Sequence, residues 1–258
     1  MVKIFQIFNG SQDSALDPLM PHYYVANFDE NWNTMTQPKT IVPDGLTMYK
    51  GSFATSMSKD FVEFFFTNPT GQRFYEWLNH TKCAEEHYFA TLIHNVNFNA
   101  PGSFPGECLH FYWQQGRWKP FVSRYQTWMF DWWHKAACEG EWTHMSCAFG
   151  VGDVPTLTRR PELMAHKLYE ELQPAASFCL EQWFWSKTVN SIQNLNATYY
   201  ENFPSVRSHS YGLLFFPLFQ GFSGEDPVLF NKHVLVSLRL YVQFVGGVVF
   251  ETAAPFIV

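Results

Sequence analysis

The sequence lacks the patterns of several enzyme classes and of nucleic-acid-binding proteins. It contains no HExxH, no D-x-D pair, no G-x-S-x-G elbow, no P-loop and no G-x-G-x-x-G turn. Charged residues make up only 16% of the chain, the net charge is −6, and no long run of Lys or Arg occurs. Binding to a phosphate backbone requires a basic surface, so we do not expect nucleic acid as a partner.

Long apolar segments are scarce as well. The N-terminus, "MVKIFQIFNGSQDSALD", has no apolar core of the length found in signal peptides or membrane anchors. Near the C-terminus, the apolar stretches 210–222 and 235–250 are shorter than the ~20 residues that a spanning helix needs, and Arg239 interrupts the second. We therefore predict no transmembrane helix there. Residues 196–258 form an unassigned apolar tail, either a buried strand or an unstructured segment.

Cysteines and glycosylation sequons point to an oxidising compartment. Asn9, Asn79 and Asn196 each begin an Asn-x-Ser/Thr sequon, and five cysteines are an odd number. Disulfides persist in the secretory lumen, which this combination favours. Because the N-terminus carries no signal, either the chain is not secretory or its N-terminal part is missing. The cysteines are Cys83, Cys108, Cys138, Cys147 and Cys179.

What the chain has in abundance is apolar and aromatic surface. Aromatic residues make up 19% and hydrophobic residues 47% of its 258 residues, enough for one substantial core. Aromatic rings also offer flat faces on which ligands such as sugars stack. The residue patterns predict a mixed α/β protein without regular alternation of strands and helices. The expected elements are an extended segment over 47–58, helices over 59–67, 71–78, 83–92, 161–169 and from Pro174, and a strand followed by a turn over 147–157.

The stretch "CAEEHYFATL" carries the first candidate for chemistry. In a helix that starts near Thr81, Glu85 and Glu86 lie in the first turns, where the helix dipole favours acidic residues in water. Glu86 in addition shares a face with apolar residues three, four and seven positions further on. A carboxylate at the head of an apolar stripe is partly desolvated, which makes it a better general base.

Metal and thiol chemistry fit the same stretch poorly. His80, His87 and His94 recur every seven residues, and seven residues of helix rise roughly 10.5 Å, too far for two of them to share one ion. Cys83 stands beside two acids, which should raise the pKa of its thiol and make it a weak nucleophile. We expect neither a metal site nor a cysteine nucleophile here.

Three blocks of sequence resemble one family. "YKGSFATSMSKDFVEFF", "CAEEHYFATL" and "CAFGVGDVPTLTRRPELMAHKLYEELQPAASFCLEQW" occur in the order of that family's GSA, PDE-x-x-WAT and C-x-(Y/F)-GAGD blocks. The sequence is therefore similar to the core-2/I-branching β-1,6-N-acetylglucosaminyltransferases, glycosyltransferase family 14. The resemblance covers about residues 45–190. We assign residues 1–195 to a partial domain of this family.

The resemblance implies a fold, an activity and a location. It implies an α/β, GT-A-like fold of which this chain holds the C-terminal half, in a type II Golgi membrane protein whose anchor is absent here. Members transfer N-acetylglucosamine from UDP-GlcNAc to an O-glycan hydroxyl with inversion, without a cofactor or metal. The family's base falls on Glu86 and its diphosphate-binding lysine falls on Lys167. Fixed positive charge is what a metal-free site needs to stabilise departing UDP.

Other family positions are only partly matched. The phosphate-binding arginine three residues before the GAGD-block cysteine is His144 here, and histidine is only partly charged near neutral pH. The acceptor-facing W-x-Y pair is matched by Trp128 and Phe130, which keeps two stacking rings but loses a hydroxyl. We expect acceptor stacking to survive and donor activation to be weaker.

The resemblance also implies a disulfide between Cys138 and Cys147, the pair of cysteines in the third block. A second bridge, from Cys83 to Cys108, is the further possibility, which would leave Cys179 unpaired.

Several functions remain open. The leading one is β-1,6-N-acetylglucosaminyl transfer, and xylosyl transfer is a sister activity in the same family. A non-catalytic sugar-binding fragment, or a shortened relative without the nucleotide-binding half, would use Trp128 and its neighbours to hold glycans. A degenerate product without a stable fold is the last alternative.

Overall fold

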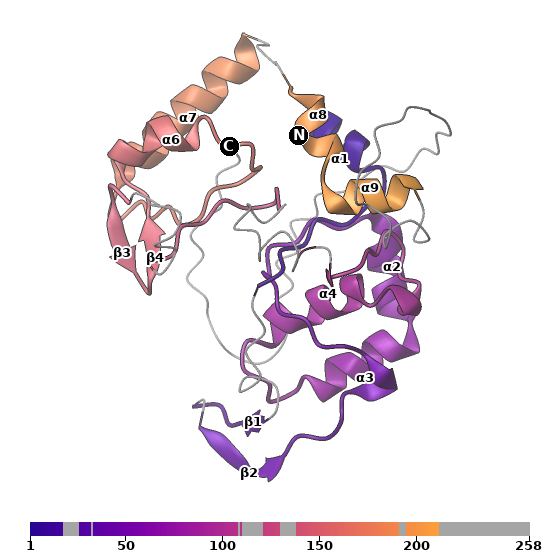
Figure 1. Ribbon diagram of the computed structural model, residues 1–258. Helices are drawn as coiled ribbons and strands as arrows, with labels where there is room; N and C mark the ends of the chain where they lie inside the picture. The colour runs from indigo at the N-terminus through magenta and orange to yellow at the C-terminus, as the bar shows by residue number, and fades with distance from the viewer. Residues whose placement is uncertain are drawn as a thin grey trace. The chain divides into compact units, whose positions relative to one another are not determined.

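The computed structural model divides the chain into two compact units. The first consists of Met1–Phe121 and Asn196–Leu238, and the second of Val122–Leu195 and Arg239–Val258. Both are drawn in Figure 1, and each is described here by itself. The residues described are 1–17, 26–31, 33–107, 109, 121–129, 138–190 and 195–211.

The first unit is mainly helical. Its strands β1 and β2 form an antiparallel pair. Its elements are α1 (Val2–Phe8), β1 (Ala26–Phe28), β2 (Thr34–Pro38), the 3-10 turn η2 (Pro43–Gly45), α2 (Lys59–Thr67), α3 (Pro69–Trp77), α4 (Ala84–His94), the 3-10 turn η3 (Val96–Phe98), α8 (Ala197–Glu201) and α9 (Pro204–Tyr211).

Capping residues set the ends of α2 and α3. The Ser58 side chain accepts a hydrogen bond from the Phe61 amide at the start of α2. Asn68 ends α2 and also begins α3, where its side chain accepts from the amides of Thr70 and Gly71 and Pro69 occupies the first turn. Both predicted helices are present and the boundary at Asn68 is as predicted, but α3 begins two residues earlier than the predicted range 71–78.

Helices α2, α3 and α4 enclose the core of the first unit (Figure 1). Phe61, Phe74, Leu92 and Ile93 are completely buried in it. Complete burial of such side chains contributes roughly 1.5–3 kcal/mol each, which fixes α4 firmly in the unit.

Two extended segments, residues 11–17 and 47–58, pair with each other, and the second contacts α4. Asp13 pairs with Ser56 and Asp17 with Lys50 in antiparallel bridges. The extended segment predicted over 47–58 is present, and its partner is residues 11–17. Gly51 allows this close packing, because a Cβ there would lie 2.2 Å from the Ala15 carbonyl oxygen.

The second unit contains a small hairpin and a long helix. Strands β3 (Glu141–Thr143) and β4 (Ser146–Ala148) pair antiparallel, and His144 and Met145 make the turn with φ of 49° and 65°. The strand and turn predicted over 147–157 are therefore present. The chain continues through the 3-10 turn η5 (Val151–Asp153), α6 (Val154–Leu157) and α7 (Pro174–Val189), which begins at proline as predicted.

The helix predicted over 161–169 is wrong. Main-chain groups of this segment pair with other segments instead: Tyr125 donates to the Met164 carbonyl, and His166 donates to the Tyr125 carbonyl. Lys167 donates to the Cys147 carbonyl, and Phe149 donates to that of Lys167. The segment is therefore an extended one between residues 122–127 and β4. Tertiary hydrogen bonding overrides its helical pattern.

Part of the tail left unassigned from residue 196 belongs to the first unit. Helices α8 and α9 pack against α1, with the rings of Phe8 and Phe203 5.6 Å apart. Residues 212–258, which include most of the apolar stretches noted above, lie outside the described residues. Among the helices that are described, none has the length and apolar character to cross a membrane.

We predict that Gly51→Ala destabilises the protein by about 1–3 kcal/mol, because the added methyl must displace backbone. Gly71→Ala is the matched control. It lies inside α3, where a Cβ meets nothing closer than 3.4 Å, and alanine is favoured over glycine in a helix by up to about 1 kcal/mol. Urea unfolding of both variants tests this. Equal stability of the two would contradict the assigned close contact.

Candidate functional site

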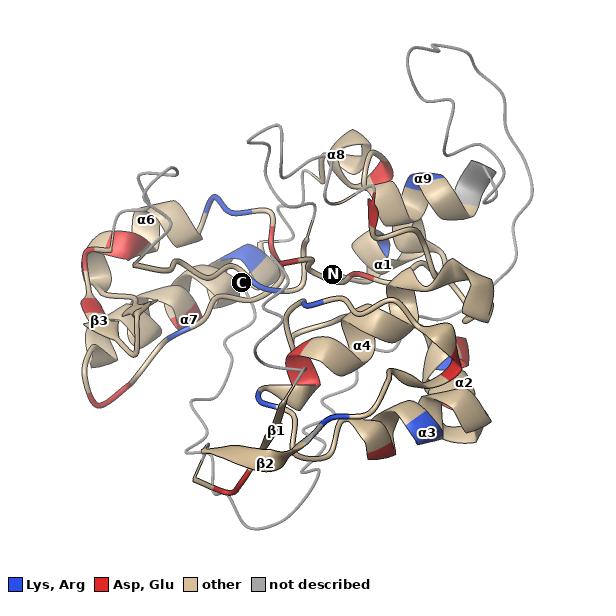
Figure 2. Ribbon diagram, turned by 60° about the horizontal axis from the view of Figure 1, so that its bottom comes forward, with Lys and Arg blue, Asp and Glu red and all other residues tan. Residues whose placement is uncertain are grey.

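The two glutamates of the opening motif lie in the first turn of α4. The helix begins at Ala84, after Cys83 with a φ of 52°. Glu85 and Glu86 therefore lie at the positive end of its dipole, and Figure 2 shows this acidic first turn. Glu85 is exposed, whereas Glu86 is half-buried. The sequence pattern thus identified the more enclosed of the two carboxylates.

Lys50 forms an ion pair with Glu86. Its Nζ lies 2.8 Å from Glu86 Oε2, and the two side chains are 11% and 25% exposed. The Gly51 amide also donates to the Glu86 carbonyl over 2.7 Å. One carboxylate oxygen of Glu86 is thereby held by a cation. Sequence reasoning missed Lys50, since it lies 36 residues before Glu86 in the chain and no local pattern links them.

Polar side chains on one stripe of α4 and just beyond it hold the segment that carries Lys50. Thr91 Oγ1 accepts from the Tyr49 amide over 3.0 Å and donates to the Tyr49 carbonyl over 3.2 Å. His87 Nδ1 lies 3.1 Å from the same carbonyl. The Asn95 side chain accepts from the Thr47 amide over 2.9 Å and donates to the Thr47 carbonyl over 2.8 Å. Four-residue spacing places these three side chains in line, so α4 fixes the position of Lys50.

Charges around Glu86 are closely spaced. Burial, followed by the charges of Glu86 and Glu85, raises the pKa of Cys83 to about 11, as the sequence predicted for this thiol. Partial desolvation and the charge of Glu86 raise the pKa of Glu85, although water still reaches its exposed side chain. Burial lowers the pKa of His87, which favours the neutral ring. Lys50 is therefore a positive charge that lies close to two carboxylates, a neutral thiol and a neutral imidazole.

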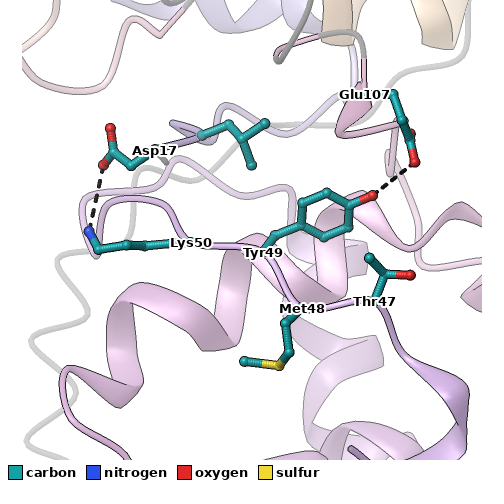
Figure 3. Close-up of a pocket in the computed structure, with 7 residues that line it drawn as sticks. Asp17, Thr47, Met48, Tyr49, Lys50 and Glu107 are labelled. Atoms are coloured by element: carbon teal, nitrogen blue, oxygen red, sulfur yellow. Dashed lines mark hydrogen bonds and ion pairs between the residues drawn. The ribbon is translucent and has the colours of Figure 1, made fainter. Parts of the chain in front are cut away.

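A pocket of about 280 Å³ lies beside Lys50 (Figure 3). Asp17 Oδ2 lies 3.9 Å from Lys50 Nζ at one end. At the other end the Tyr49 hydroxyl donates to Glu107 over 3.1 Å. Burial and Glu107 raise the pKa of Tyr49, so this hydroxyl stays protonated. The lining residues are Leu16, Asp17, Thr47, Met48, Tyr49, Lys50 and Glu107.

The three regularly spaced histidines have separate surroundings. His80 is exposed, and the other two are buried. His94 Nδ1 lies 3.1 Å from the Phe104 carbonyl, whereas His87 contacts Tyr49. They do not converge on one point. Cys138, Cys147 and Asp153 do lie within 4.8 Å of one another, but the two sulfurs are bonded to each other and not free to act as thiolate ligands.

Lys167, in the second unit, lies at the end of β3. Its Nζ donates to the Thr143 carbonyl over 3.3 Å, directly before His144 in the turn. Burial, then the charge of Arg124, lowers the pKa of Lys167. Burial, with the charges of Arg124 and Lys167, lowers the pKa of the neighbouring His166 to about 3. The structure thus brings Lys167 close to the hairpin of His144 and adds a second cation, Arg124.

Sequence reasoning missed Arg124. It is part of segment 122–127, which pairs with residues 163–166, and this pairing was hidden by the predicted helix over 161–169. The expected diphosphate arginine at position 144 is a histidine, and that residue is exposed at the turn. Arg124 is therefore the permanent cation that accompanies Lys167.

The expected acceptor-facing aromatics are only partly described. Trp128 is 41% exposed, and its main chain pairs with Ser146 of β4. An indole with this exposure presents a face for stacking. Phe130 lies outside the described residues.

Cys138 and Cys147 are joined by a disulfide, as the family resemblance implied. Beside it, the buried carboxylate of Asp153 accepts from the amides of Glu139 and Gly150. The second predicted bridge, from Cys83 to Cys108, is wrong in this structure. Cys83 is a free thiol, close enough to the charges of Glu86 and Lys50 to be influenced by both.

The remaining cysteines and the sequons complete the set of candidate residues. Cys179 on α7 is free, as expected, and Cys108 lies outside the described residues. The asparagines of all three sequons, Asn9, Asn79 and Asn196, are exposed, which is the accessibility that glycosylation of these side chains would require.

A sequence model of the Core-2/I-Branching enzyme family matches residues 5–157. The chain therefore belongs to this family of glycosyltransferases, as the three sequence blocks indicated. The match begins 44 residues before the first of those blocks and so includes segment 11–17, which lies before the range 45–190 given above for the resemblance.

Curated relatives support the same class. The probable beta-1,3-galactosyl-O-glycosyl-glycoprotein beta-1,6-N-acetylglucosaminyltransferase 7 of Sus scrofa is 29% identical over 141 residues, covering 55% of this chain and 30% of the relative. The N-acetyllactosaminide beta-1,6-N-acetylglucosaminyl-transferase of Homo sapiens is 26% identical over 158 residues, covering 61% and 36%. The beta-1,3-galactosyl-O-glycosyl-glycoprotein beta-1,6-N-acetylglucosaminyltransferase 3 of Mus musculus is 25% identical over 203 residues, covering 73% of this chain and 44% of the relative. The chain thus spans less than half of each relative.

We predict that Cys138 and Cys147 resist alkylation in the folded protein, whereas Cys179 reacts. Closing this loop should stabilise the fold by roughly 2–3 kcal/mol on the chain-entropy model. Peptide mapping under non-reducing conditions decides the pairing. Free reaction of both Cys138 and Cys147 with an alkylating agent would show that the bridge does not form, and the exposed-thiol control is the same protein after reduction.

Proposed function

We propose that the protein transfers N-acetylglucosamine from UDP-GlcNAc to a hydroxyl of a galactose-containing O-glycan acceptor, with inversion and without a metal ion. The observation that carries the proposal is the half-buried Glu86 carboxylate at the start of α4, paired through Oε2 with Lys50. Membership in the family and the β-1,6-N-acetylglucosaminyltransferase names of the relatives support this reaction class.

Glu86 would act as the general base. The acceptor hydroxyl oxygen attacks the anomeric carbon of the donor, its proton passes to the Glu86 carboxylate, and the bond from that carbon to the diphosphate breaks. Because Lys50 holds Oε2, Oε1 is the oxygen that would accept the proton. Base catalysis of this kind contributes typically 10²–10⁴-fold.

Lys167 and Arg124 would stabilise the departing UDP. Leaving-group charge develops as the glycosidic bond breaks, and preorganised cations that meet it there lower the barrier. Each of the two charges lowers the pKa of His166, so both act on one small region. The exposed His144 in the adjacent turn would contribute only when protonated.

The remaining parts of the proposal follow from family membership. We propose a GT-A-like α/β fold that acts in the Golgi lumen. Exposed Trp128 would stack on the acceptor glycan.

A non-catalytic sugar-binding protein is the second candidate. The specific observation in its favour is that the described site residues include an exposed stacking ring, Trp128, which needs no donor to hold a glycan. Saturation-transfer NMR separates the two candidates. A transferase binds both UDP-GlcNAc and a galactose-containing disaccharide, whereas a sugar-binding protein of this kind binds the disaccharide alone.

We predict that Glu86→Gln lowers turnover by about 10²–10⁴-fold and leaves the affinity for UDP-GlcNAc unchanged, since the amide cannot accept the proton. Glu85→Gln is the matched control, because Glu85 is the exposed neighbour in the same helical turn, and should retain most of the activity. Steady-state transfer assays and donor titration measure both quantities. Wild-type turnover in Glu86→Gln would exclude Glu86 as the base.

We predict that Lys167→Ala weakens UDP binding and lowers turnover, because it removes a charge that meets the leaving group. Lys187→Ala, at an exposed position of α7, controls for the loss of one positive charge in the same unit. Calorimetric titration with UDP measures the effect, and transfer should persist in excess EDTA. A requirement for added manganese would contradict the metal-free proposal.

A further inference from the structure

The pocket beside Lys50 has a charge pattern that selects against anions. Its rim carries two carboxylates, Asp17 and Glu107, and one ammonium group. That ammonium group is already paired with Glu86 at 2.8 Å, so the surroundings are net negative. A phosphate or a sulfate would be repelled here. The ligand that fits is neutral.

The same rim suits a ligand rich in hydroxyl groups. In Figure 3 the Asp17–Lys50 pair forms one end of the pocket, and the Tyr49 hydroxyl with Glu107 forms the other. Carboxylates accept hydrogen bonds from hydroxyls, and such charge-assisted bonds are stronger than neutral ones. The Leu16 side chain and the Tyr49 ring, which also line the pocket, offer apolar surface for C–H groups.

The size of the pocket limits the ligand further. Its volume of about 280 Å³ is below the ~300–1,000 Å³ of sites that hold drug-sized molecules. One sugar ring fits such a volume, whereas a sugar nucleotide does not. Gly106 packs closely on the Tyr49 ring that lines the pocket, because a Cβ there would lie 2.5 Å from that ring.

Lys50 links the pocket to the general base. Its Nζ lies 3.9 Å from Asp17 Oδ2 within the pocket and 2.8 Å from Glu86 Oε2. The ammonium group of Lys50 thus lies between the carboxylates of Asp17 and Glu86. A sugar ring that is hydrogen-bonded to Asp17 would therefore lie near the Glu86 carboxylate. We propose that this pocket is a subsite for one neutral pyranose ring of the acceptor glycan, a proposal that rests on the function proposed above.

Met48 reports on the wall of the pocket. It lies between the lining residues Thr47 and Tyr49, and its side chain points away from the pocket into the core (Figure 3), so its ¹³C-labelled methyl signal, assigned by its loss in Met48→Leu, should shift when methyl β-galactoside binds against this wall. UDP should leave that signal unmoved, because the pocket repels anions. Asp17→Asn and Glu107→Gln should each weaken the galactoside response roughly tenfold, since each removes a charge-assisted hydrogen bond. Glu63→Gln, an exposed carboxylate on α2 of the same unit, should leave it unchanged.

The outcomes separate this inference from the proposed transfer reaction. A shift of the Met48 signal that persists in Glu86→Gln, while transfer is lost, supports both. Transfer with no Met48 response to the galactoside, or an equal response to glycerol at the same concentration, overturns the subsite and leaves the reaction standing. A galactoside response in a protein that shows no transfer shows that the pocket binds a pyranose, but overturns both the proposed transfer and the acceptor role given to the subsite.

Discussion

The main-chain clamp on Tyr49 is the interaction on which the first unit's site depends. Thr91 and His87 of α4 satisfy both polar groups of that residue, and all three are buried. A buried peptide group without such partners costs about 1–3 kcal/mol, so this segment has one register against the helix. The next residue along the chain is Lys50. The register of the segment places Lys50 beside Glu86. The ion pair is therefore a consequence of the register and is not needed to set it.

Local signals in the sequence predicted local structure well. Ser58, Asn68 and Pro174 mark helix ends through hydrogen bonds or φ values that involve only neighbouring residues, and the structure agrees at all three. The helix prediction for residues 161–169 was wrong because the structure of this segment depends on distant residues. Its backbone partners lie at residues 122–125 and 147–149, and no periodicity within the segment records them. Lys50 and Arg124 escaped notice in the same way, because each acquires its role through contacts with distant residues.

The two units carry charge of opposite character at their candidate sites. Around Glu86 the first unit has carboxylates and one paired lysine. In the second unit, burial first and then the charges of Arg124 and Lys167 lower the pKa of His166 to about 3, so two cations act on this ring. Cations suit a diphosphate, and carboxylates suit the hydroxyls of a neutral sugar. The charges thus divide the proposed donor and acceptor functions between residues of the two units.

The two carboxylates beside Lys50 also explain why substitution of Glu86 should leave the fold intact. Removing one partner of a buried ion pair is usually costly, because the other charge is left uncompensated. Lys50 has a second carboxylate, Asp17, at 3.9 Å. Loss of the Glu86 charge would therefore leave the ammonium group with an anion still in reach. Loss of Lys50 is a different case, because Glu86 would lose its ion-pair partner and Glu85 would lose a cation that offsets the charge of Glu86. The stability of this site is thus more sensitive to its lysine than to the carboxylate that we propose as the general base.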